Sequence, residues 1–118
     1  MLKKKNRVSK REVDQIFKIG KFLISPNFTF KFIFTNKSIP PRISFITPKN
    51  VAKLAVKRNF LRRRGYNALE KYINQFPSGL IGVFVFKKYQ EDILIIEDEI
   101  KNILNKTNWF LPEKYFYF

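Results

Sequence analysis

The segment from Phe28 to Phe34 constrains the fold of this chain more than any other part of its sequence. Its residues read Phe-Thr-Phe-Lys-Phe-Ile-Phe, so that an aromatic ring occupies every second position. Because successive side chains of a β-strand point to opposite faces, this spacing predicts a strand with one strongly apolar face. If that face packs on helices, then Thr29, Lys31 and Ile33 face the other way.

The rest of the chain predicts a single domain of the α+β class. Ser9 and Glu12 form a possible capping box for a first helix that stops at Gly20, and Asn50 is a suitable N-cap for a second helix. Helices are expected over about residues 9–19 and 51–73 and from about residue 91, and strands over about residues 22–25, 28–34, 42–47 and 80–86. The resulting order of elements is α-β-β-β-α-β-α.

Several classes of chemistry are excluded by composition. The chain of 118 residues is long enough for one hydrophobic core, and it contains neither cysteine nor histidine. Disulfides, thiol nucleophiles, the usual zinc sites and imidazole acid–base catalysis are therefore absent. Adjacent carboxylates at residues 97–99 diverge on a helix and favour a solvated face over a metal site. We expect no catalytic residue, no metal bound by this chain, no membrane segment and a cytoplasmic location.

Positive charge is concentrated in one part of the sequence. The formal net charge is +15, and between Gln15 and Leu69 there are twelve Lys or Arg residues and no Asp or Glu. Five of the nine acidic residues lie between Glu91 and Glu99. Such asymmetry implies a strong positive field that a polyanion would neutralise. RNA, DNA and an anionic membrane are the candidates, and the membrane is the weakest because the apolar face of the basic helix is narrow.

The predicted helix of residues 51–73 carries much of this charge. At helical spacing, its apolar face gathers Leu54, Leu61, Ala68, Leu69 and Tyr72, and a neighbouring stripe holds Lys53, Lys57, Arg64 and Lys71. A run of charge on a helix is often only a solvated face, but no acidic residue stands within reach to offset this one. The candidate RNA-binding residues are Lys53, Lys57, Arg58, Asn59, Arg62, Arg63 and Arg64.

Two alternatives stay open at single positions. Arg58 and Asn59 can contact a nucleotide phosphate or base, or they can only bond loop carbonyls. Phe17 can lie beside Lys31 in a cleft walled by the basic helix, a surface that suits single-stranded nucleic acid, or it can be plain core.

The segment Ala-Val-Lys-Arg-Asn at residues 55–59, followed by Leu-Arg-Arg at residues 61–63, resembles the bacterial ribonuclease P protein component. That family carries Ala-Val-x-Arg-Asn-Arg-hydrophobic-Lys-Arg on its main helix. Phe-Lys-Ile-Gly at residues 17–20 is similar to the end of its first helix, and residues 42–49 are similar to its strand and lysine-containing loop. The resemblance covers about residues 3–106. We therefore expect an RNA-binding domain over residues 1–106 and an aromatic tail of unknown role over residues 107–118.

The chain departs from this family within the basic helix. Phe60 stands where a second arginine is usual, and Tyr66 stands where a further arginine is common. Gly65 is an interior glycine, which costs a helix about 1 kcal/mol relative to alanine. Arg62 to Arg64 would compensate for the RNA contacts missing at residues 60 and 66.

The resemblance implies an α/β sandwich with a four-stranded sheet and a left-handed crossover. It implies the protein subunit of ribonuclease P, the endonuclease that matures the 5′ end of tRNA, with catalytic RNA and precursor tRNA as partners. The RNA subunit would carry the chemistry and bind most of the Mg²⁺, and Phe17 and Lys31 would lie in the cleft that holds the 5′ leader. The oligomeric state is left open. The alternative function is a structural ribosomal RNA-binding protein without a processing role.

Overall fold

The computed structural model describes residues 7–35 and 39–107 and contains three α-helices and four strands in this part of the chain. The helices are α1 (Lys10–Ile19), α2 (Ala55–Glu70) and α3 (Ile93–Thr107), with a short 3-10 helix, η2 (Ile73–Gln75), after α2. The strands are β1 (Lys21–Ile24), β2 (Phe28–Phe34), β3 (Arg42–Ile46) and β4 (Leu80–Phe86). This order confirms the predicted one. Thr107, assigned by prediction to the tail, ends α3 and is buried, and residues 108–118 lie outside the described part.

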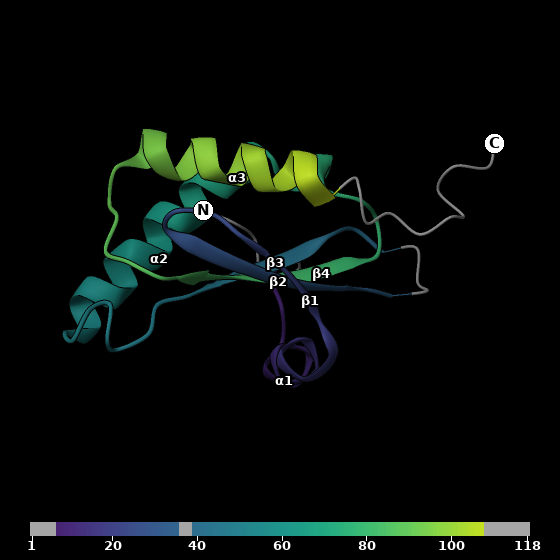
Figure 1. The fold of residues 1–118 in the computed structure, drawn as a ribbon, viewed down its shortest axis with the longest axis horizontal. Helices are drawn as coiled ribbons and strands as arrows, with labels where there is room; N and C mark the ends of the chain where they lie inside the picture. The colour runs from purple at the N-terminus through teal and green to yellow at the C-terminus, as the bar shows by residue number, and fades with distance from the viewer. Residues whose placement is uncertain (1–6, 36–38, 108–118) are drawn as a thin grey trace.

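All four strands form one sheet in the order β1-β2-β4-β3. β2 is antiparallel to both β1 and β4, whereas β3 and β4 are parallel neighbours. Two parallel neighbours need a crossover connection, and α2 lies in that connection. Helices cover both faces of the sheet, with α1 on one side and α2 and α3 on the other (Figure 1).

The face toward α2 and α3 is made of aromatic rings. Phe28, Phe30 and Phe32 are fully buried on it, as the alternation predicts. Phe84 of β4 lies at the centre of these rings, with its ring centroid 4.4 Å from that of Phe30 and 5.1 Å from that of Phe45 on β3. The helices add their own apolar side chains to this core, among them Leu61, Leu69, Ile96, Ile100 and Ile103.

The face toward α1 is smaller and aliphatic. Its buried side chains are Ile16 of α1 and Ile81 and Val83 of β4. Ile33 and Val85 pack against them and are only partly buried. This cluster is separate from the aromatic core, because the sheet divides the two.

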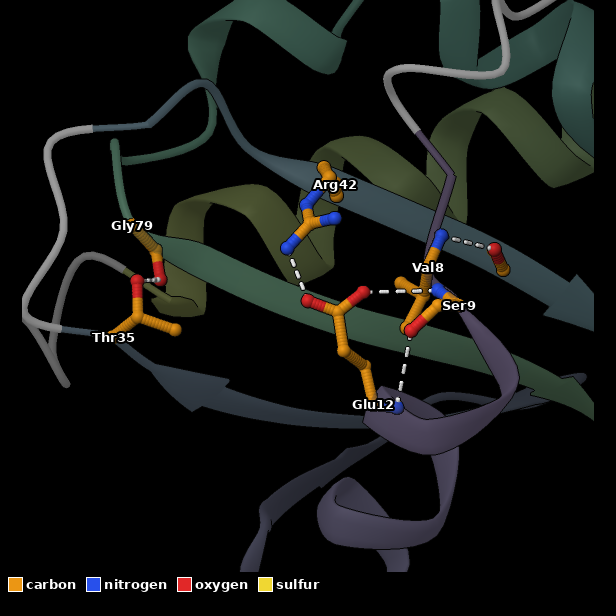
Figure 2. A network of polar contacts seen from close by, with 7 residues as sticks. Val8, Ser9, Glu12, Thr35, Arg42 and Gly79 are labelled. Atoms are coloured by element: carbon orange, nitrogen blue, oxygen red, sulfur yellow. Dashed lines mark hydrogen bonds and ion pairs between the residues drawn. The ribbon is translucent and has the colours of Figure 1, made fainter.

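Polar contacts fix the start of α1 on this face. The predicted capping box is present, since Ser9 N donates to Glu12 Oε1 at 2.9 Å and Glu12 N donates to Ser9 Oγ at 3.3 Å. Glu12 also accepts a hydrogen bond from the guanidinium of Arg42 on β3 (Figure 2). Val8 N donates to the hydroxyl of Ser44 on the same strand, at 2.8 Å. These bonds fix the angle at which the chain enters α1.

The basic helix begins later than predicted. Residues 48–51 form a turn in which Val51 N donates to Pro48 O at 3.1 Å, so Asn50 is part of this turn and caps no helix. Leu54 takes the N-cap position in an extended conformation, with no side-chain cap. Because Leu54 lies ahead of the helix, it is 63% exposed and leaves the predicted apolar face. The helix also ends sooner, at Glu70, and η2 follows it.

The predicted solvated acidic face of α3 is wrong for Glu99, which is only 4% exposed. Its carboxylate accepts hydrogen bonds from the Ser25 hydroxyl at 2.6 Å, Asn27 N at 2.7 Å and Asn27 Nδ2 at 2.6 Å. A buried carboxylate needs such donors to replace its water. Glu99 therefore fastens α3 to the turn between β1 and β2.

Candidate nucleic-acid interface

The outward side of α2 is basic along its length. Lys57 and Arg63 are exposed on α2, and Arg62 and Arg64 are partly exposed. Lys53, which the prediction placed on the helix, is exposed in the loop ahead of it. No acidic residue lies in the first turn of the helix. Lys71, which belongs to the predicted stripe, differs from the others because its Nζ lies 2.9 Å from the Glu97 carboxylate of α3. This hydrogen bond raises the pKa of Lys71 above its usual value and offsets its charge.

The structure answers the open question about Arg58. Its Nη1 donates to the carbonyls of Ala52, at 3.0 Å, and Lys53, at 2.7 Å. The guanidinium thus holds the loop ahead of α2, where no side chain caps the helix. Arg58 still brings a positive charge to this surface, but it first serves as a support for the loop.

Asn59 has a different arrangement from its neighbour. It is exposed, and its Oδ1 accepts a hydrogen bond from Nη2 of Arg62 one turn later in the helix. Asn59, Arg62 and Arg63 line a hollow of about 230 Å³ together with Arg7 and Tyr66. Three guanidinium groups around one hollow are well suited to a phosphate, because each presents several donors in a planar fork.

Arg7 was not among the predicted binding residues. It precedes α1 in the chain, and its guanidinium lies 4.5 Å from the ring centroid of Tyr66 on α2. The sequence contains no local signal for this contact, since the two residues are distant in the chain. Their proximity depends on the path of residues 7–9 along β3, where Val8 bonds Ser44.

At the positions of α2 that differ from the family pattern, the residues of this chain pack against other side chains. Tyr66 is buried against Phe45, and its hydroxyl accepts a hydrogen bond from Phe45 N at 3.2 Å. Phe60 is partly buried and lies under the guanidinium of Arg64, which is 5.0 Å from its ring centroid. An added Cβ on Gly65 would lie 2.6 Å from the Phe45 ring, so this glycine allows the close approach of helix and sheet. Its helix cost is offset by that packing.

Phe17 and Lys31 lie together on the other side of the sheet. Lys31 Nζ is 4.6 Å from the ring centroid of Phe17, and Phe17 is 44% exposed. Neither residue belongs to the buried core, which excludes the plain-core interpretation of Phe17. The predicted pair is therefore present and accessible to solvent.

The expectation that α2 forms a wall above Lys31 is wrong. The helix α2 lies on the opposite side of the sheet from α1 (Figure 1), and its buried stripe packs on the aromatic face. Lys31 contacts the ring of Phe17 on α1 and therefore points to the other face. The cations of α2 and the Phe17–Lys31 pair therefore lie in different layers. Arg7 precedes α1 in the chain, but its guanidinium lies against Tyr66 of α2.

Three further lysines, which were not among the predicted binding residues, follow strands of the sheet. Lys49 follows β3, and Lys87 and Lys88 follow β4. These strands are parallel and end in register, with Ile46 opposite Val85, so the three exposed lysines follow the same end of the sheet. Lys87 Nζ donates to Ser25 O at 3.2 Å and is partly engaged. The pairing of β3 with β4 was needed to see this cluster.

Two kinds of site are absent from residues 7–35 and 39–107. No group of three or more Asp or Glu side chains in this part lies close enough to hold a metal ion. None of its helices has the length and apolar character needed to cross a membrane.

Comparison with known proteins adds independent information. The family model described as Ribonuclease P matches residues 2–108. The ribonuclease P protein component of Pseudanabaena sp. (strain PCC 6903) is 29% identical over 114 residues, which cover 91% of this chain and 95% of the relative.

Solved structures show the same fold at lower identity. The ribonuclease P protein of Thermotoga maritima has a TM-score of 0.73 at 21% identity and covers 85% of this chain and 96% of its own. The ribonuclease P protein of Staphylococcus aureus has a TM-score of 0.73 at 15% identity and covers 86% of this chain and 94% of its own. The match of the family model over most of the chain decides the assignment: this chain belongs to the ribonuclease P protein family.

Proposed function

We propose that this protein binds the catalytic RNA of ribonuclease P through the basic side of α2 and the 5′ leader of precursor tRNA through the surface around Phe17 and Lys31. The observation that carries the proposal is the hollow lined by Arg7, Arg62 and Arg63. Family membership supports an RNA partner in tRNA 5′ processing, and the charges indicate which surfaces it would contact.

The α2 side suits a folded RNA. The hollow combines guanidinium forks with the amide of Asn59, and such groups contact phosphates irrespective of sequence. Lys53 ahead of α2 and the cations from Lys57 to Arg64 on the helix would neutralise several phosphates. RNA affinity would then fall steeply with salt.

The α1 side suits an unpaired strand. Phe17 presents an exposed ring on which a base can stack, and Lys31 presents a cation beside it. Single-stranded nucleic acid is bound by this combination of aromatic surface and positive charge. The Phe17–Lys31 pair and the cations of α2 lie on opposite sides of the sheet. Two separate RNA segments would therefore reach these surfaces more easily than one.

The chemistry in this proposal belongs to the RNA. The chain offers no histidine or cysteine and has no carboxylate cluster in its described part that would hold a catalytic metal. The Mg²⁺ ions would be held mainly by the RNA subunit. The protein would act by lowering repulsion between RNA segments and by holding the leader in place.

Reconstitution with the cognate catalytic RNA tests this function. Protein should increase precursor-tRNA cleavage at low Mg²⁺, and the double variant Arg62→Ala/Arg63→Ala should weaken binding of the catalytic RNA by about tenfold or more. Each lost phosphate contact should also reduce the salt slope by about 1. Lys101→Ala, which removes an exposed cation from α3, is the matched control. Cleavage that is the same with and without protein would refute the proposal.

A further inference from the structure

The outer side of β1 exposes two large apolar side chains. Phe22 is 60% exposed and Ile24 is 54% exposed, although both belong to a regular strand. Leu23 between them points the other way and packs against the aromatic core. β1 therefore contributes to the fold with one face and leaves the other open.

The register places this open face beside the Phe17–Lys31 pair. Phe22 is directly opposite Lys31 of β2, and Ile24 is opposite Thr29. Side chains directly opposite in an antiparallel pair lie on the same face, with Cβ atoms about 5 Å apart. Lys31 thus stands between two exposed rings, that of Phe17 on α1 and that of Phe22 on β1.

Charge distinguishes between the partners that such a surface could take. Lys18, which follows Phe17 in α1, is exposed, and the sequence contains no acidic residue between Gln15 and Leu69. Aromatic rings beside cations suit single-stranded nucleic acid, because its bases can stack on the rings and its phosphates can be neutralised by the cations. A second copy of this chain would bring the same net charge of +15 to the contact, and this repulsion would oppose association.

We propose that the leader surface continues across β1, where Phe22 stacks with a base of single-stranded RNA and Ile24 forms an apolar flank. The inference rests on the proposed function and extends it by at least one nucleotide. The bound strand would run from Phe17 past Lys31 to Phe22. The chemical class of the ligand is an unpaired RNA segment, recognised by the faces of its bases and not by their edges.

Abasic scanning of the leader tests this extension. Precursor tRNAs with one abasic nucleotide at each leader position are bound to the reconstituted holoenzyme made with the wild-type protein, Phe22→Ala or Phe17→Ala. Removing a stacked base or its ring should cost about tenfold in affinity. We expect Phe22→Ala to become insensitive to abasic substitution at one or two positions, next to those at which Phe17→Ala becomes insensitive.

Controls separate stacking from changes in the fold. Phe22→Trp should retain the abasic profile of the wild type, whereas Phe22→Leu should lose it at the same positions as Phe22→Ala. Leu94→Ala, at an exposed apolar residue of α3, should change nothing. All variants should keep the salt slope of the wild type, because none of them removes a phosphate contact.

Three results would overturn the inference. A wild-type profile that is flat over the whole leader would refute leader binding itself, and with it this extension. A structured wild-type profile that Phe22→Ala leaves unchanged would refute the extension alone. Self-association of the wild type that Phe22→Ala abolishes, measured by sedimentation, would assign the open face of β1 to a second copy of the chain.

Discussion

On the face that α2 and α3 cover, the sheet presents packed aromatic rings, whereas on the face that α1 covers it presents β-branched aliphatic side chains. The first face buries Phe28, Phe30 and Phe84 completely. On the second, the only fully buried side chains of the described residues are Ile16 and Val83. The difference shows that one side of the sheet supplies most of the apolar burial that stabilises the domain.

This division has a consequence for binding. An exposed apolar side chain adds no burial energy to folding, because water contacts it in the folded and the unfolded state alike. Because the aromatic face buries most of the core, the opposite face can keep Phe17 and Phe22 exposed beside Lys31. The surface proposed to bind the leader therefore lies on the side of the sheet with the smaller buried cluster.

The largest effect expected from this comparison comes from neighbouring residues of β4 that point to opposite faces. Phe84→Ala should lower the free energy of unfolding by about 3–5 kcal/mol, because it removes the ring at the centre of the aromatic core. Val83→Ala should cost about 2 kcal/mol, since it removes two carbons from a smaller cluster. Urea denaturation measures both. Equal losses would contradict the asymmetry, and Phe84→Leu replaces Phe84→Ala if that variant does not fold.

A second, smaller effect tests how closely α2 packs on the aromatic face. Gly65→Ala should destabilise by about 1–3 kcal/mol, because the new Cβ must displace the Phe45 ring. Asn67→Ala, at an exposed position of the same helix, should be neutral or slightly stabilising through helix propensity. Thermal unfolding of the two variants provides the measurement. If both substitutions stabilised the protein, helix and sheet would be farther apart than described.

The smallest effect concerns the polar attachment of α1. Glu12→Ala removes a side chain that serves both the capping box and the Arg42 ion pair, and it should cost about 1 kcal/mol. Asp14→Ala, at an exposed position of the same helix, is the control. Hydrogen exchange should show faster exchange in α1 and unchanged exchange in β4. Equal acceleration in both elements would mean that α1 and the sheet unfold as one unit.

Much of the fold was predictable because its signals are local. The alternation of residues 28–34 specified β2 to the residue, and Ser9 with Glu12 specified the start of α1. The start of α2 was missed because it depends on tertiary contacts. Asn50 has the chemistry of an N-cap, yet the turn closing on Pro48 and the bonds of Arg58 to loop carbonyls move the helix start to Ala55.

The candidate interface was predictable only in part, for a related reason. Cations at helical spacing identified α2, and the alternation of residues 28–34 placed Lys31 on the face where Phe17 could lie beside it. Arg7 and Lys87 were missed because their places depend on strand pairing and on the path of the chain along β3. Glu99 was misjudged in the same way, since its partners Ser25 and Asn27 come from the far end of the sequence.

The strand order has a consequence for synthesis of the chain. β3 ends at Ile46, but its parallel neighbour β4 begins only at Leu80, so this pair cannot form until α2 has been synthesised. The β1–β2 hairpin can form earlier, because its strands are local. At about 5–20 residues per second, translation leaves an interval of seconds in which the basic segment has emerged while β4 is missing and β3 has no neighbouring strand. The ribosome, itself rich in RNA, is the first polyanion that this segment meets.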